Sequence, residues 1–252
     1  MTEVLRIEGL SKSFGALEVG RDLSLKLGTG DRVALIGPNG AGKTTFINLV
    51  TGAVPPSSGH VFLAGHDITT MSMVGRVRRG LVRSFQVTRV FRARTVAENV
   101  RLAVLQRERR TGRIFIAAAS MADTEVEVAA VLDTLELGEF ANRTVREIAY
   151  GQQRLLEIAI ALALKPKVLL LDEPSAGVSR EESPRILEAI NNLPMDIAVL
   201  MIEHDMDLVF RFATRVVVMA AGEFIFNGGP GEVASSPHVR EAYLGSYARA
   251  RG

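Results

Sequence analysis

A glycine-rich segment between two apolar segments constrains the fold of this chain more than any other feature. It reads Gly37-Pro38-Asn39-Gly40-Ala41-Gly42-Lys43-Thr44-Thr45 and fits the pattern G-x-x-x-x-G-K-[ST]. An apolar run at 33–36 precedes it, and the start of a helix pattern follows at 46–50. This order predicts a buried strand, a loop and a helix, which is the context that gives the pattern its chemical meaning.

The loop residues have the chemistry of a phosphate-binding site. Glycines allow successive backbone N–H groups to point at one place, and the positive end of the following helix adds to this anion cradle. Lys43 would contact the β- and γ-phosphates of a nucleotide, and the Thr44 hydroxyl is placed to bind Mg²⁺. The alternative is a glycine-rich turn without a ligand. We expect a nucleotide and Mg²⁺ as ligands, bound by the loop residues Gly37, Pro38, Asn39, Gly40, Ala41, Gly42, Lys43, Thr44 and Thr45.

The composition narrows the class of protein further. The 252 residues, 47% of them hydrophobic, are enough for one large domain or two small ones. A net charge of +2 gives no global field for nucleic acid, and the absence of cysteine excludes disulfides and thiolate chemistry. No apolar run approaches the roughly 18 residues of a membrane-spanning helix, and no signal peptide is present. We expect a soluble intracellular protein.

Arginine is concentrated in two places. The clusters are Arg76, Arg78, Arg79 and Arg83, and then Arg107, Arg109, Arg110 and Arg113. A solvated face is the simpler interpretation, and a contact surface for an acidic partner or for lipid headgroups is the alternative.

Short apolar runs predict an α/β fold. The runs at 33–36, 168–171, 197–202 and 216–219 are typical of strands buried on both faces of a parallel sheet. Shorter pieces at 5–10, 24–27 and 61–63 suggest an antiparallel layer, and Gly222 marks a hairpin. The segments 95–106 and 124–137 carry helical spacing, with Gly138 as the expected C-terminal cap. We predict one domain over 1–252, with a core at about 1–86 and 155–252 and an inserted helical subdomain at about 87–154.

Two acidic residues end one of the predicted buried strands. Asp172 and Glu173 follow the run 168–171, at the place where open α/β sheets carry ligand-binding groups. Asp172 is a candidate to hold Mg²⁺ through water, and Glu173 is the natural general base for a water that attacks the γ-phosphate. The alternative is a strand that ends in two solvated carboxylates.

A glycine-containing turn at 148–154 precedes an apolar segment at 155–164. This segment predicts a buried helix, and its N-terminus is a second candidate phosphate site. With the phosphate loop and Leu171-Asp172-Glu173-Pro174, this turn resembles, in order and spacing, the motifs of ABC transporter ATPase subunits. That resemblance covers essentially the whole chain and implies a P-loop NTPase fold with a RecA-like core.

The resemblance implies roles for further residues. Phe14 resembles the aromatic residue that stacks on adenine, and Gln86 resembles the glutamine that reaches Mg²⁺ and senses the membrane partner. His204 resembles the histidine that contacts the γ-phosphate, a role that also suits an imidazole after a buried strand. The implied nucleotide and metal contacts beyond the loop are Phe14, Gln86, Tyr150, Gly151, Gln152 and Asp172.

The family resemblance also implies partners. In such ATPases two subunits enclose two ATP molecules, and each site joins the phosphate loop of one subunit to the signature turn of the other. The segments 150–154, 202–206 and 241–245 look like those of branched-chain amino acid importers, whose relatives take up urea, amides or aromatic acids. We expect two transmembrane permease subunits, a second ATPase subunit, a periplasmic solute-binding protein that acts indirectly, and a position on the cytoplasmic face of the inner membrane.

Two positions depart from the family pattern. Ala149 stands where the signature turn has a serine whose hydroxyl would contact the γ-phosphate, so we expect the partner's site to be weakened. This asymmetry favours a heterodimer over a homodimer. Ser179 stands where many relatives have an aspartate, and it either forms a capping box with Glu182 or contacts the other subunit.

Two other functions remain as alternatives. A soluble ABC ATPase that acts on nucleic acid or ribosomes would be supported only by the arginine clusters, and such proteins usually carry two ATPase copies or a long coiled coil. A phosphate-loop kinase would leave the signature turn, Gln86 and His204 without a purpose. We therefore expect an ATP-hydrolysing importer subunit, with Lys43, Glu173 and His204 as catalytic residues and no nucleic-acid partner.

Overall fold

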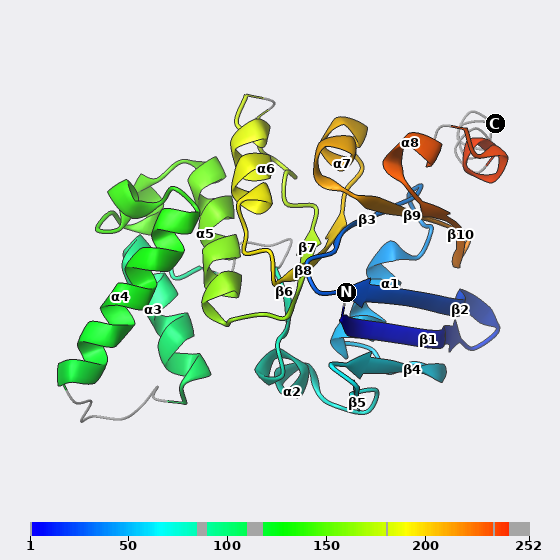
Figure 1. Ribbon diagram of the computed structural model, residues 1–252, viewed down its shortest axis with the longest axis horizontal. Coiled ribbons are helices and arrows are strands. Elements are labelled where there is room, and N and C mark those ends of the chain that lie inside the picture. Colours follow the sequence, from blue (N-terminus) through cyan, green and yellow to red (C-terminus); the bar gives the residue numbers. More distant parts are fainter. Residues whose placement is uncertain (1, 85–89, 110–117, 180, 234, 242–252) are drawn as a thin grey trace.

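The computed structural model describes residues 2–84, 90–109, 118–179, 181–233 and 235–241, and it contains two sheets (Figure 1). The strands of the larger sheet lie in the order β10 (Glu223–Gly228), β9 (Arg215–Ala220), β3 (Arg32–Ile36), β8 (Ala198–Ile202), β7 (Val168–Asp172) and β6 (Leu81–Arg83). All neighbouring pairs are parallel except β10 and β9, which form the hairpin predicted at Gly222.

The parallel strands are buried along their length, as their apolar runs predicted. Every residue of β3, β7 and β8 is buried. Pairing aligns Leu35 of β3 and Asp172 of β7 with the same residue, Ile202 of β8. Three strands therefore end at one edge of the sheet, where the segments that follow them meet.

The second sheet is antiparallel and confirms the predicted layer. Its order is β2 (Leu17–Gly28), β1 (Glu3–Phe14), β4 (Ser58–Leu63) and β5 (His66–Asp67). The helix α1 (Lys43–Thr51) shares one core with both sheets, in which Leu5, Leu35 and Phe46 are fully buried. The loop before α1 therefore lies between two packed layers.

The helices gather largely on the other side of the larger sheet (Figure 1). There α3 (Val96–Arg107), α4 (Ala118–Thr134) and α5 (Tyr150–Ala163) pack together, followed by α6 (Ser183–Asn191) and α7 (Met206–Phe212). The short elements are α2 (Met73–Arg78), α8 (Pro230–Val233) and the 3₁₀ helices η1 (Gly138–Phe140) and η2 (Val145–Glu147). No described helix is long and apolar enough to cross a membrane.

Two predicted helix ends were wrong. The helix expected at 155–164 begins at Tyr150, so the residues interpreted as a turn form its first turns and the subdomain boundary expected at 154 lies inside a helix. The helix α4 does not end on Gly138. Glu136 takes the left-handed conformation, and the N–H of Leu137 donates to the Leu132 carbonyl at 2.8 Å. These contacts form a Schellman cap, which a glycine usually provides.

The expectation of a solvated arginine face was wrong for Arg76. Its side chain is 1% exposed and donates to the carbonyls of Leu49 and Val50 in the last turn of α1, at 2.9 and 2.6 Å, and to those of Thr69 and Met71. Carbonyls in the last turn of a helix lack the usual i+4 N–H partner, and among the backbone contacts of the described residues the Leu49 carbonyl otherwise accepts only the N–H of the C-cap Gly52, at 3.2 Å. Burial lowers the pKa of the Arg76 guanidinium, and its hydrogen bonds make it a structural cap of α1. Arg110 and Arg113 lie outside the described residues.

Candidate functional site

The phosphate loop is held between two other strands by close backbone contacts. A Cβ atom on Gly37 would lie 2.1 Å from the Met219 carbonyl oxygen, and one on Gly42 would lie 2.9 Å from that of Val19. Gly42 is the left-handed N-cap of α1, with φ of 105°. Glycine is therefore required at both positions, because β9 and β2 approach the loop too closely for a side chain.

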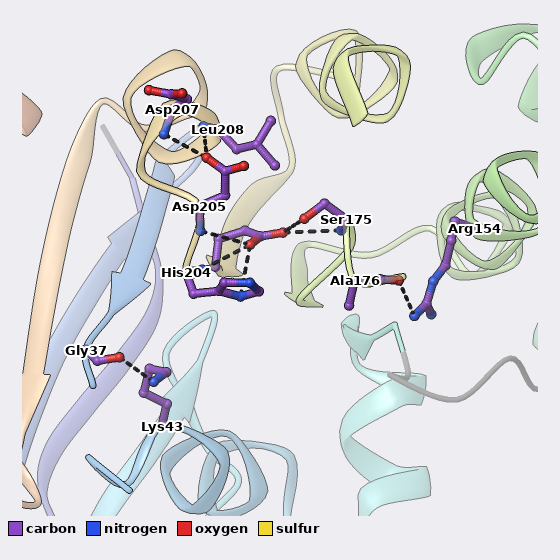
Figure 2. Close-up of polar contacts among 10 residues, drawn as sticks. Gly37, Lys43, Arg154, Ser175, Ala176, His204, Asp205, Asp207 and Leu208 are labelled. Carbon is purple, nitrogen blue, oxygen red and sulfur yellow. Dashed lines mark hydrogen bonds and ion pairs between the residues drawn. The ribbon is translucent and has the colours of Figure 1, made fainter. Parts of the chain in front are cut away.

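Lys43 lies at the start of α1 and faces the loop that precedes it. Its Nζ donates to the carbonyl oxygen of Gly37 at 2.6 Å (Figure 2) and to that of Pro38 at 3.1 Å. Burial lowers the pKa of Lys43, and the charges of Glu173 and Asp172 act against this shift. The fold thus brings together three of the predicted site residues. No acidic residue lies in the first turn of α1, so its positive end is not neutralised there.

Asp172 is the last residue of β7 and is 4% exposed. Its Oδ2 atom accepts a hydrogen bond from Nη2 of Arg83, the last residue of the neighbouring strand β6. Nη1 of Arg83 donates to Asn48 Oδ1 of α1 at 2.8 Å. Sequence reasoning placed Arg83 in a surface cluster and missed this contact, because the pairing of β6 with β7 brings the two residues together and no local pattern indicates it.

Glu173 has an unusual backbone for its residue type. Its φ of 48° lies in the left-handed region, and its N–H donates to the carbonyl of Ile202 at 3.0 Å. Such conformations are unfavourable for residues other than glycine and occur often at functional sites. The backbone therefore turns sharply away from β7 at the residue predicted to be the general base.

His204 follows β8, and its side chain is 69% exposed. Its N–H donates to Glu203 Oε2 at 3.0 Å, and its Nδ1 atom lies 3.7 Å from the same oxygen (Figure 2). Glu203 itself is 1% exposed. Sequence reasoning overlooked Glu203, although it follows a buried strand just as Asp172 and Glu173 end one.

The signature residues lie away from this loop. Tyr150, Gly151 and Gln152 form the first turn of α5, and Ala149 is its N-cap without a side-chain hydrogen bond. In Figure 2, Arg154 of the same helix lies on the far side of Ala176 from Lys43. This arrangement leaves Tyr150, 39% exposed, at the surface.

Three further predicted residues are Phe14, Gln86 and Ser179. Phe14 ends β1 and is 54% exposed, and Lys12 Nζ lies over its ring at 4.9 Å from the centroid. Gln86 lies outside the described residues. Ser179 accepts a hydrogen bond from the Glu182 N–H at 3.3 Å, but α6 begins only at Ser183, so this cap lies before the helix.

The side chains at this edge suit Mg²⁺ held together with a nucleotide. The exposed Thr44 hydroxyl and the Asp172 carboxylate offer oxygen ligands, which Mg²⁺ prefers. Within the described ranges, no group of three or more His, Cys, Asp or Glu side chains could hold a metal ion. Phosphate oxygens of a bound nucleotide are common further ligands of Mg²⁺ in such sites.

Comparisons with known proteins agree with this arrangement. Residues 21–176 match the family model described as ABC transporter. The chain is 38% identical over 252 residues to the high-affinity branched-chain amino acid transport ATP-binding protein BraF of Pseudomonas aeruginosa, covering 96% of this chain and 98% of that protein. It is 35% identical over 246 residues to the lipopolysaccharide export system ATP-binding protein LptB of Acidithiobacillus ferridurans, covering 97% and 98%.

A solved structure shows the same fold. The ADP conformation of MJ1267, an ATP-binding cassette of an ABC transporter, superposes with a TM-score of 0.84 and 30% identity over 97% of this chain and 100% of that one. A phosphate loop, an acidic strand end and a post-strand histidine lie in a fold shared with that cassette. With a family match over more than half of its length, this chain belongs to the ABC transporter family as an ATP-binding subunit with ATPase activity.

Proposed function

We propose that this ATPase drives the uptake of branched-chain amino acids, or of a closely related small solute, through separate membrane subunits. The observation that carries the proposal is the 38% identity to BraF over nearly the whole of both chains. The LptB relative at 35% identity serves lipopolysaccharide export. The solute is therefore the part of the proposal that most needs a direct test.

The site supports a hydrolytic role for a small set of side chains. Lys43 and the loop amides would bind the phosphates, and Thr44, Asp172 and Gln86 would hold Mg²⁺. When bound with the nucleotide, Mg²⁺ neutralises charge on the β- and γ-phosphates. Glu173 would accept a proton from the attacking water, and the His204 imidazole would donate a hydrogen bond that orients this water and the γ-phosphate.

A second ATPase subunit would complete each site. The N–H groups at the start of α5 and the exposed Tyr150 would contact the nucleotide on the partner's phosphate loop. Ala149 supplies no hydroxyl there, which favours a heterodimer with one weaker site over a homodimer with two. Phe14 would stack on the adenine of the chain's own site.

A groove between α2 and α3 offers a place for a permease helix. It has a volume of about 260 Å³ and is lined by Met73, Val74, Val77 and Leu164, with Arg78 and Arg109 among its polar residues. Met73 and Val74 are 37% and 58% exposed. An amphipathic helix with acidic flanks would cover these apolar side chains. This docking would place the ATPase on the cytoplasmic face of the inner membrane, with a periplasmic solute-binding protein acting through the permeases.

Reconstitution tests the solute. The chain is purified together with the two permeases and the second ATPase with which it assembles, and the complex is placed in proteoliposomes with its solute-binding protein. We expect ATP-dependent accumulation of labelled leucine, isoleucine or valine, and none with Glu173→Gln. Transport of urea or an amide instead would assign the subunit to an importer of those solutes. Salt-sensitive binding of RNA by the isolated subunit would favour a soluble ABC ATPase that acts on nucleic acid or ribosomes.

A further inference from the structure

Glu203 is a buried carboxylate for which the proposed hydrolysis has assigned no role. It follows β8 directly and is 1% exposed. Burying a charged carboxylate is unfavourable unless its oxygens accept hydrogen bonds. The donors that satisfy Glu203 come from two separate loops, and each loop carries one of the residues assigned to water activation.

One oxygen of Glu203 holds the loop that follows Glu173. Oε1 accepts the N–H of Ser175 at 3.2 Å and also the Ser175 hydroxyl. The N–H of Ala176 donates to the Glu173 carbonyl at 3.0 Å, which closes a tight turn over the same residues. Fixing Ser175 therefore fixes the turn that carries the left-handed Glu173 backbone.

The other oxygen holds the loop of His204. Oε2 accepts the N–H of His204 at 3.0 Å and lies 3.5 Å from the N–H nitrogen of Asp205. The His204 Nδ1 atom lies 3.7 Å from the same oxygen, close enough for an electrostatic attraction. This contact orients the imidazole with its Nδ1 edge toward Glu203 and leaves Nε2 on the side away from that carboxylate.

We propose that Glu203 is a positioning residue for ATP hydrolysis, which sets the Glu173 loop and the His204 imidazole relative to each other. The inference rests on the proposed roles of Glu173 and His204. Figure 2 shows Ser175 on one side and His204 on the other side of the hydrogen bonds that join their two loops, with Asp205 next to His204. A single carboxylate with one oxygen toward each loop links the ends of β7 and β8 more tightly than the backbone alone.

The test compares Glu203→Gln with the wild-type chain in the assembled transporter. Glutamine has nearly the same size, but it replaces one accepting oxygen with a donating NH₂ that would face other donors. We expect turnover to fall about 10- to 100-fold, as removal of a residue that orients catalytic groups commonly does. Mg-ATP affinity of the isolated subunit should change by less than about twofold, because the phosphate loop is untouched. The matched control is Glu223→Gln, at an exposed glutamate. It should leave both the turnover and the Mg-ATP affinity unchanged.

A double-mutant cycle separates positioning from general stability. In a His204→Ala background, Glu203→Gln should cost only about threefold in turnover, because its effect on His204 is already lost and only its effect on the Glu173 loop remains. Ser175→Ala, at a partly exposed position, removes only one contact and should lower turnover by about threefold without loss of folding. If Glu203→Gln fails to fold, Ser175→Ala alone decides, and wild-type turnover would overturn the inference.

The remaining outcomes are distinct. Normal turnover of Glu203→Gln beside an impaired His204→Ala overturns the role of Glu203 only. Fully additive losses, or an equal loss of ATP affinity, would make Glu203 a structural residue and also overturn it. Normal turnover of His204→Ala would instead contradict the proposed role of His204.

Discussion

Arg83 and Asp172 form an ion pair at the ends of the adjacent parallel strands β6 and β7. The Arg83 side chain is 14% exposed and that of Asp172 is 4% exposed, and Arg83 also bonds Asn48 of α1. The pair therefore ties an edge strand to the strand end that carries the predicted metal ligand. Removal of one partner of a buried pair leaves the other charge without compensation.

Replacing Arg83 with glutamine should destabilise the fold and weaken Mg²⁺ binding. We expect a loss on the order of 3 kcal/mol in the free energy of unfolding, measured by urea denaturation. Arg146→Gln, on an exposed arginine of η2, is the control. The Mg²⁺ concentration needed for nucleotide binding should rise in Arg83→Gln. If the required Mg²⁺ concentration falls instead, Arg83 competes with Mg²⁺ for Asp172 rather than positioning this carboxylate.

Glu173→Gln should separate nucleotide binding from hydrolysis. The amide cannot accept the proton of the attacking water, so turnover should fall by at least about 100-fold. Binding of a fluorescent ATP analogue should remain within about twofold of wild type, because Lys43 and the loop are unchanged. Hydrolysis at the wild-type rate would remove Glu173 from the role of general base.

Ala149→Ser should act in two measurable ways. Serine at the N-cap of α5 can accept a hydrogen bond from the first turn, which stabilises by about 1 kcal/mol relative to alanine. Thermal unfolding of the isolated subunit measures that gain. In the assembled complex the same hydroxyl should raise turnover at the partner's site, since a hydrogen bond to a charged phosphate contributes about 1.5–3 kcal/mol. Unchanged turnover with a raised melting temperature would confine the effect to capping.

Nucleotide affinity should decline at alkaline pH because of Lys43. Burial lowers the pKa of its ammonium below the ordinary 10.5, so the folded protein loses this charge at a lower pH than a free lysine does. Affinity should be constant below the lowered pKa and fall as the pH rises through it. At a pH between the lowered pKa of the folded state and the ordinary pKa of the unfolded state, Lys43 keeps its proton only in the unfolded chain. Burial of the Lys43 charge therefore lowers the free energy of unfolding fully below the folded pKa, and this loss of stability decreases as the pH rises above it. A titration of ATP affinity from neutral to alkaline pH measures the decline, and in Lys43→Met both the affinity and its pH dependence should be lost.

Local sequence determined the elements and most of the chemistry of this protein. The pattern from Gly37 to Thr45 requires a strand, a glycine loop and a helix, and the apolar runs before Asp172 and His204 predict buried strands. These are short-range patterns, in which the periodicity of burial and the backbone freedom of glycine act within a few residues. For the same reason the start of α5 was misplaced, because Tyr150 to Arg154 lack an apolar repeat and the packing of the whole helix fixes its first turn.

Only the tertiary structure decided which of these residues share contacts. Arg83 and Asp172 are far apart along the chain and meet because β6 and β7 are parallel neighbours. Arg76 looked like part of a solvated cluster, yet it lies against the end of α1 and is buried there. Glu203 gave little sequence signal, because its importance depends on two loops that the sheet brings to one edge. Sequence therefore determined which groups could do the chemistry, and the parallel register of β3, β7 and β8 determined how they are arranged, because strand pairing acts across the whole chain.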